Sequence, residues 1–177
     1  MTVLQASMED VEGLVELMNT AYRGDASRRG WTTEADLVDG PLRTDPKHLH
    51  QLMNGKDTTI LKAVDEHGNL EGCVYLQKRN EMLYLGMLSV WPNKQARGTG
   101  KLLMEAAEQL AKAGNCPSVY MRVIAGREEL ISWYNRKGYY DTGRREPFED
   151  SQYGTARIPL EFIVLQKDLI NDSPFAK

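Results

Sequence analysis

The sequence lacks the long apolar runs that a membrane-spanning segment requires. No stretch of the 177 residues approaches the roughly 18 consecutive apolar residues that cross a bilayer. The first residues, MTVLQASMED, have no basic segment followed by an apolar one, so we expect no secretory signal. We therefore expect a cytoplasmic protein without a membrane partner.

Cysteine is scarce and basic charge is not in excess. Cys73 and Cys116 lie far apart and form no CxxC pattern, which indicates reduced, core-facing thiols. Lysine and arginine number 22 against 25 acids, a net charge of -3, which argues against a nucleic-acid partner. His48 and His50 would face different sides of a helix, and no cluster of ligands completes a site, so we expect no metal.

The apolar periodicity that is present predicts one domain over residues 1–177, with no internal repeat. A short helical piece is expected after Thr32–Thr33, within a polar segment. The main helices are expected at 7–22, 45–55, 99–114 and 127–138, and the strands at 2–6, 58–65, 70–79, 81–92, 117–124, 139–148 and 158–169. The strand at 81–92 is almost wholly apolar, which predicts burial on both faces. This order predicts an α/β protein with a mixed sheet and helices on its faces.

A glycine-rich run, QARGTGK at 95–101, precedes the helix at 99–114. It is not a Walker loop, because Gln95 stands at the first glycine position and Leu102 at the hydroxyl position. It is not a dinucleotide fingerprint either, because Leu103 stands at the third glycine position. Neither ATP nor NAD is therefore indicated.

The same run can still bind an anion. Gly98 and Gly100 would let the backbone approach a ligand closely, and the first amides of a helix have no partner within it. Those amides and the helix dipole favour a pyrophosphate, with Arg97 and Lys101 adding charge at the rim. The alternative is a glycine-rich helix start that binds nothing.

The run LSVWPNKQARGTGKLLM, at 88–104, resembles motif A of the GNAT (Gcn5-related) N-acetyltransferases, in which Q/R-x-x-G-x-G/A follows a buried strand. A second run, WYNRKGYY at 133–140, is similar to the Y-x-x-x-G-[FY] signature of that family. The matching residues are Gln95, Arg97, Gly98, Gly100, Tyr134, Gly138 and Tyr139. The resemblance covers roughly residues 1–167 and implies the GNAT acyl-CoA N-acyltransferase fold, whose central sheet is mostly antiparallel.

The resemblance implies acetyl-CoA as the acetyl donor. Its pantetheine arm would pair like an added strand with Leu88 and Val90, where the buried amides of the arm find partners. The pyrophosphate would be held by the backbone of Gln95, Ala96, Arg97, Gly98, Thr99, Gly100 and Lys101.

The resemblance also implies catalytic positions. The amide of Leu88 would stabilise charge on the thioester oxygen, and Tyr134 would act as general acid toward the thiolate. Tyr84 occupies the position where several members carry a glutamate, and Arg127 the position where many carry Asn. The proton of the amine would then leave through water, or the amine would bind already neutral. From spacing alone, a core aromatic residue is the favoured interpretation of Tyr134, and the family motif reverses that preference.

By the same resemblance, residues 22–45 and 146–157 would wall the acceptor pocket. Glu34 and Asp25 are the candidates to hold an ammonium group, and Arg28 and Arg29 could hold a carboxylate or phosphate. Most of these charges could instead be ordinary solvated loop charges.

The sequence thus predicts an N-acetyltransferase that moves acetyl from acetyl-CoA to a primary amine by direct attack. A small-molecule acceptor is favoured over a protein, because the long segment at 22–45 suggests a capped pocket. The open alternative is a non-catalytic acyl-CoA-binding or sensing module of the same fold. A homodimer is compatible with the sequence.

Overall fold

The computed structural model describes residues 1–169; residues 170–177, which the expected domain includes, lie outside the described part. Its main sheet has seven strands in the order β1-β3-β4-β5-β6-β9-β7. Only β5 and β6 run parallel, so the expected mixed, mostly antiparallel sheet is confirmed. The strands are β1 (Thr2–Gln5), β3 (Thr58–Val64), β4 (Leu70–Arg79), β5 (Met82–Val90), β6 (Ser118–Ile124), β7 (Tyr140–Pro147) and β9 (Glu161–Asp168).

The helices follow the apolar periodicity of the sequence. The longer ones are α1 (Val11–Tyr22), α3 (Pro46–Met53), α4 (Thr99–Ala113) and α5 (Glu128–Asn135), with short 3-10 turns η1 (Met8–Asp10) and η2 (Pro92–Lys94). Asp45 begins α3 by accepting a hydrogen bond from the backbone of His48 at 2.7 Å. Gly138, with a φ of +91°, follows α5 in the left-handed conformation that ends many helices.

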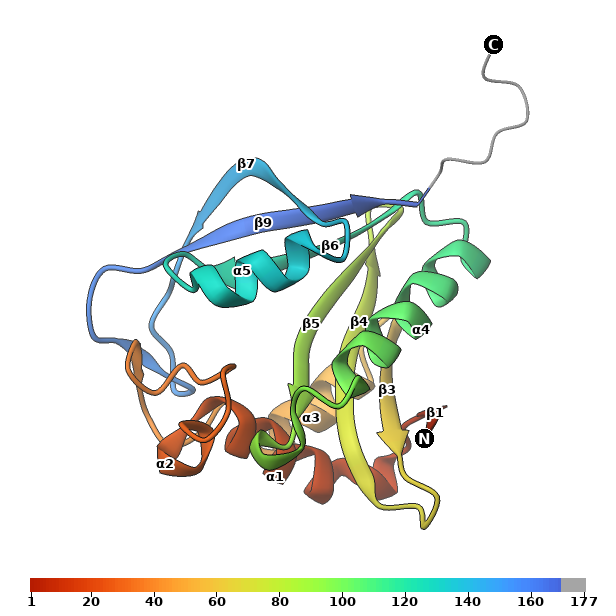
Figure 1. Cartoon of the computed structure of the whole chain (residues 1–177), viewed down its shortest axis with the longest axis horizontal. Helices are drawn as coiled ribbons and strands as arrows, with labels where there is room; N and C mark the ends of the chain where they lie inside the picture. Colours follow the sequence, from red (N-terminus) through yellow and green to blue (C-terminus); the bar gives the residue numbers. More distant parts are fainter. Residues whose placement is uncertain (170–177) are drawn as a thin grey trace.

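Helices cover both faces of the sheet, and alternate residues of β4 point to each layer. Val74 and Leu76 belong to the core formed with α4 and α5. Cys73 and Tyr75 belong to the core formed with α1 and α3 on the opposite face. Figure 1 shows α4 and α5 in front of the sheet and α3 behind it.

Strands β5 and β6 separate soon after they meet. They pair only through Leu83 with Val119 and Tyr84 with Tyr120, and Figure 1 shows β5 running away from β6 toward α1. Beyond Tyr84, the edge of β5 that faces β6 has no strand partner among the described residues. The expectation that 81–92 is buried on both faces is therefore wrong, because residues 86–88 border this opening and are partly exposed.

A β-bulge lies where β5 borders the opening. The register between β4 and β5 shifts so that Val74 stands opposite both Met87 and Leu88. Met87 has a φ of +52°, which is uncommon for a residue other than glycine. The bulge changes the direction of the backbone at Leu88, the residue that the sequence singled out.

The polar segment after α1 differs from the expectation. Its helix, α2 (Gly24–Ser27), comes before Thr32 rather than after it, and a turn closed by the bond from Val38 N to Glu34 O follows. Thr33 caps only this single turn, since the strand β2 (Val38–Asp39) begins directly after it. β2 pairs with the short strand β8 (Thr155–Ala156), which the sequence did not reveal.

Candidate active site

Three cavities follow one another through the opening between β5 and β6. We call them the α4 cavity, of about 210 Å³, the central cavity, of about 70 Å³, and the outer cavity, of about 550 Å³. The α4 and central cavities share Tyr22, Leu88, Leu130 and Tyr134. The central and outer cavities share Glu34, Arg43, Tyr84, Met87, Arg122, Ile124 and Phe162. Leu88 thus lies between two routes of approach.

The α4 cavity is bounded by the start of α4. Ala96 and Gly98 have φ values of +64° and +91°, and these two left-handed residues turn the chain from η2 into the helix. The first intrahelical bond is donated by Leu102 to Gly98, so the preceding amides have no partner within the helix. The hydroxyl of Thr99 is buried and has no hydrogen-bond partner in the described structure. The amides at the start of the helix can therefore supply unused donors to an anion.

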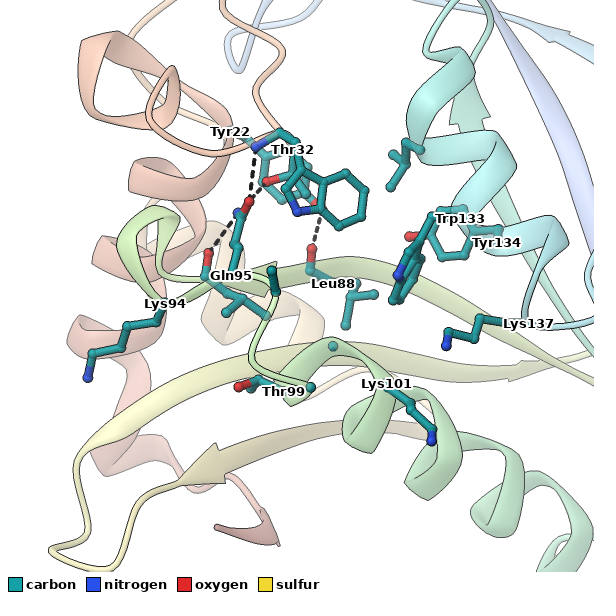
Figure 2. Close-up of a pocket in the computed structure, with 16 residues that line it drawn as sticks. Tyr22, Thr32, Leu88, Lys94, Gln95, Thr99, Lys101, Trp133, Tyr134 and Lys137 are labelled. Carbon is teal, nitrogen blue, oxygen red and sulfur yellow. Dashed lines mark hydrogen bonds between the residues drawn. The ribbon is translucent and has the colours of Figure 1, made fainter.

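The side chain of Gln95 holds neighbouring backbone rather than pointing to open space. Its Oε1 accepts from the amide of Trp31 at 3.0 Å, and its Nε2 donates to the hydroxyl of Thr32 at 2.9 Å and to the carbonyl of Val90 at 3.2 Å. Figure 2 shows these bonds at the wall of the cavity. Gln95 therefore joins the glycine-rich run to the segment after α1. Of the remaining predicted residues of this run, Arg97 is exposed and outside the cavity lining, whereas Gly100 and Lys101 line the cavity.

Two tyrosines flank Leu88. The hydroxyl of Tyr22 donates to the carbonyl of Leu88 at 2.5 Å. Tyr134 is 6% exposed, and Figure 2 shows it beside Trp133, across the cavity from Leu88. Burial, followed by the charge of Glu34, raises the pKa of Tyr22 to about 12, and burial raises the pKa of Tyr134 further. Both hydroxyls therefore keep their protons near neutral pH.

Glu34 is buried between two arginines. It forms ion pairs with Arg23 and with Arg127, the latter at 3.3 Å, and is itself 8% exposed. Arg127 also donates to the carbonyl of Thr32. Glu34 lines the central and outer cavities as the sequence led us to expect, but its carboxylate is already neutralised. Asp25 is fully exposed, pairs with Arg28 at 3.6 Å and lines none of the three cavities.

Tyr84 stands at the base of the opening, surrounded by cations. The guanidinium carbon of Arg79 lies 4.1 Å from the centre of its ring and that of Arg122 lies 5.8 Å away. Several members of the family that the sequence resembles carry a glutamate at this position. Here Tyr84 instead contacts cations through the face of its ring. The structure brings Tyr84, Leu88 and Tyr134 around one central cavity.

Sequence reasoning missed several residues of the α4 cavity: Tyr22, Trp31, Leu130, Trp133 and Lys137. Tyr22 and Leu88 are 66 positions apart, so no local pattern could pair them. Trp133 did carry a signal, since it precedes the tyrosine of the WYNRKGYY run. Its ring faces Gly100, where an added Cβ would lie 3.5 Å from it.

Residues 1–169 contain no group of three or more His, Cys, Asp or Glu side chains placed to hold a metal ion. His48 stacks on Tyr153 with ring centres 4.6 Å apart, and its Nδ1 lies 2.8 Å from the hydroxyl of Thr44. Within the same residues, no helix has both the length and the apolar character needed to cross a membrane.

Comparison with known proteins agrees with this geometry. Residues 14–139 match the model of the acetyltransferase (GNAT) family, which is more than half of the chain. No curated protein sequence matches the chain.

Solved structures share the fold at low sequence identity. A candidate phosphinothricin N-acetyltransferase is 16% identical, with a TM-score of 0.72, over 96% of this chain and 99% of the other. Ribosomal-protein-alanine N-acetyltransferase from Brucella melitensis is 17% identical, with a TM-score of 0.71, over 96% and 100%. A candidate acetyltransferase from Salmonella typhimurium, solved with its cofactor acetyl-CoA, is 16% identical, with a TM-score of 0.67, over 98% and 96%.

Proposed function

The chain belongs to the acetyltransferase (GNAT) family, and from that premise we propose that it transfers acetyl from acetyl-CoA to a primary amine of a small molecule. One observation carries the proposal: a series of cavities with shared lining residues extends from the glycine-rich start of α4 to a second, arginine-lined cavity. An enzyme that joins two substrates needs a route of approach for each. The two routes meet at Leu88 and Tyr134.

The α4 cavity fits the pyrophosphate of acetyl-CoA. The backbone from Gln95 to Lys101 includes two left-handed residues and the free amides of the helix start. Leu88 and Val90 lie on the edge of β5 that lacks a strand partner. We propose that the amides of the pantetheine arm bond to this edge, as a peptide does when it extends a sheet.

The residues beside Leu88 suit acyl transfer. The amine nitrogen bonds to the carbonyl carbon of the thioester, the carbon–sulfur bond breaks, and sulfur leaves with the electron pair. The amide of Leu88 would stabilise the charge that develops on the carbonyl oxygen. Tyr134, whose hydroxyl keeps its proton near neutral pH, would give that proton to the sulfur. The nitrogen loses a proton as the amide forms, and that proton would return through water to the tyrosinate.

The central cavity supplies no free carboxylate to remove the proton of the amine. Glu34, its one acid, is paired with Arg23 and Arg127. Nearby positive charge disfavours an ammonium ion and favours the neutral amine. We propose that the acceptor loses its proton to water as it enters among the arginines, and attacks as a neutral amine.

A small-molecule acceptor is favoured because two segments meet across the outer cavity. β2 pairs with β8, Arg157 forms an ion pair with Asp39 at 2.6 Å, and the hydroxyl of Tyr153 donates to Asp45 at 2.9 Å. An extended peptide would have to displace these contacts. The remaining volume, about 550 Å³, lies within the range of roughly 300–1,000 Å³ typical of small-molecule sites.

Thermal unfolding with added ligands tests the binding step. We expect acetyl-CoA to raise the unfolding temperature, and ATP or NADH to leave it unchanged. Equal protection by all three would remove the phosphate-site assignment. Released CoA, measured by thiol detection across a panel of amines, then separates an enzyme from a binding module that never turns over.

Tyr134→Phe tests the chemistry. We expect kcat to fall by roughly 10²-fold, within the range for loss of a general acid, with acetyl-CoA affinity changed less than twofold. An unchanged kcat would leave Tyr134 as a packing residue. Tyr140→Phe is the matched control, since its exposed hydroxyl bonds to Asp168 at the far edge of the sheet.

A further inference from the structure

Arginine dominates the central and outer cavities. The charged residues that line them are five arginines and three glutamates, with no lysine or aspartate. The arginines are Arg23, Arg43, Arg79, Arg122 and Arg127, and the glutamates are Glu34, Glu146 and Glu149. This excess of positive charge occurs in a chain whose net charge is -3. The lining therefore differs in sign from the protein as a whole.

The carboxylates present do not neutralise these cations one for one. Glu34 is shared by Arg23 and Arg127. Glu146 is likewise shared, between Arg122 at 3.2 Å and Arg144 at 3.3 Å. Each of these carboxylates serves two guanidinium groups, which leaves the cavities positively charged.

Two of the cavity arginines have no carboxylate partner in the described part of the chain. Within residues 1–169, neither Arg43 nor Arg79 has an acidic group within 4.0 Å of its guanidinium nitrogens. Arg79 donates to the neutral amide of Gln77 at 2.6 Å. Arg43 is partly buried, and such guanidinium groups usually have anionic partners, whereas Arg79 is exposed to solvent. Both line the outer cavity without a carboxylate partner among the described residues.

Aromatic rings hold these arginines near the reacting position. The guanidinium carbon of Arg43 lies 5.7 Å from the ring centre of Tyr22, whose hydroxyl bonds to the carbonyl of Leu88. Arg79 and Arg122 both approach Tyr84, on the same strand as Leu88. Stacking on a ring leaves the donors at the edge of a guanidinium group free to bind a planar or tetrahedral oxyanion.

We infer that the acceptor carries an anionic oxygen group, a carboxylate or phosphonate, bound by Arg43 and Arg79 while its amine reaches Leu88. This inference rests on the proposed acetyl transfer and specifies its substrate class: amino acids and aminoalkylphosphonates rather than polyamines or aminoglycosides. Arg122 contributes from β6, where Glu146 leaves it only partly neutralised.

Matched pairs of amines test the inference by activity. Each amino acid is compared with its carboxamide, and each aminoalkylphosphonate with its neutral dialkyl ester. The carboxamide has the less basic amine and is intrinsically the easier acceptor, so a preference for the acid must come from the protein. In the pair that gives the highest turnover, we expect kcat/KM to be at least tenfold higher for the anionic member than for the neutral one. Equal or better use of the neutral members would overturn the inference and leave acetyl transfer intact.

Arginine variants locate the effect. Arg43→Gln and Arg79→Gln are each expected to raise KM for the anionic acceptor roughly tenfold, with kcat and acetyl-CoA affinity nearly unchanged. Arg136→Gln is the control, because Arg136 is exposed at the end of α5 and lines none of the three cavities. A loss shared equally by anionic and neutral acceptors would mean that these arginines act on the fold rather than on the anion.

A binding measurement separates this inference from the proposed function. N-acetyl-amino acids, N-acetyl-aminoalkylphosphonates and their neutral counterparts are titrated into the protein saturated with CoA. Binding of only the anionic compounds, lost in Arg43→Gln, would support the anion site even if no amine were turned over. Turnover of neutral amines without anion binding would support the enzyme and reject the site. Absence of anion binding in the whole panel would reject it as well.

Discussion

The hydroxyl of Tyr22, the last residue of α1, donates a hydrogen bond of 2.5 Å to the carbonyl of Leu88 in β5. Leu88 takes part in the bulge opposite Val74, so this bond fixes the one irregular point of the strand. Tyr22 is 9% exposed, and the bond is therefore largely shielded from water.

Tyr22→Phe should consequently impair both stability and catalysis. The carbonyl of Leu88 would lose its partner, which costs about 1–3 kcal/mol of unfolding free energy for a buried acceptor. Looser positioning of the neighbouring amide should lower kcat roughly tenfold, since about 1.4 kcal/mol corresponds to a factor of ten. Denaturant unfolding and steady-state kinetics check the two effects. A loss of stability with full kcat would show that the bond serves only the fold.

Gly98→Ala should weaken acetyl-CoA binding through backbone strain. The φ of Gly98 is +91°, and an added Cβ would meet no atom within 4 Å, so strain rather than a clash is the cost. Gly68, in the hairpin between β3 and β4, is matched in both respects, with a φ of +81°. Each substitution should lower the unfolding free energy by about 1 kcal/mol. Only Gly98→Ala should raise the Kd of acetyl-CoA, and equal Kd values would contradict the phosphate assignment.

Glu34→Gln should be strongly destabilising. The substitution leaves Arg23 and Arg127 close together without an anion between them, and removing one partner of a buried ion pair costs about 3–5 kcal/mol. Asp36→Asn is the control, since it breaks an ion pair with the exposed Arg28 and should change stability little. Denaturant midpoints at constant pH compare them. Similar midpoints for both variants would mean that water reaches Glu34 freely.

Acid should destabilise the fold through His48. Burial, and then the charge of Arg43, lower the pKa of His48 in the folded protein below its ordinary value of 6.5. The unfolded chain therefore binds a proton more readily, and stability falls as the pH drops from about 6.5 toward the folded pKa. Well above pH 6.5, His48 is neutral in both the folded and the unfolded chain, so it does not contribute to the change of stability with pH.

His48→Gln should remove this slope between pH 7.5 and 5, whereas the exposed His50→Gln should retain it. The comparison uses the change of unfolding free energy with pH, because loss of stacking on Tyr153 changes its absolute value. Parallel curves for the two variants would assign the acid sensitivity to other groups.

Most of the fold could be predicted because its determinants are local. Alternating or continuous apolar residues mark the main-sheet strands other than β7, and Gly55, Gly114 and Gly138 follow the ends of helices. The expectation of a helix after Thr33 was wrong, because contacts with residues outside this segment determine its conformation. Ser27 and Thr33 bond to each other at 2.5 Å, and β2 is set by its pairing with β8.

The site was predictable only in part for the same reason. The glycine-rich run and Tyr134 carry patterns that can be read along the chain. The partner of Glu34, Arg127, lies 93 positions away, and the arginines around Tyr84 come from different strands. From the sequence, Glu34 was a charge available to bind a substrate. In the structure its carboxylate is paired with two arginines and forms part of the cavity lining.

Because only two residue pairs join β5 to β6, the two halves of the sheet can fold one after the other during translation. Strands β1, β3, β4 and β5 come from the first 90 residues and pair among themselves, and α1, α3 and α4 cover them by residue 113. Domains generally begin to fold from the amino terminus as the chain emerges. The half of the sheet that carries Leu88 can therefore assemble before α5, which carries Tyr134, has emerged from the ribosome.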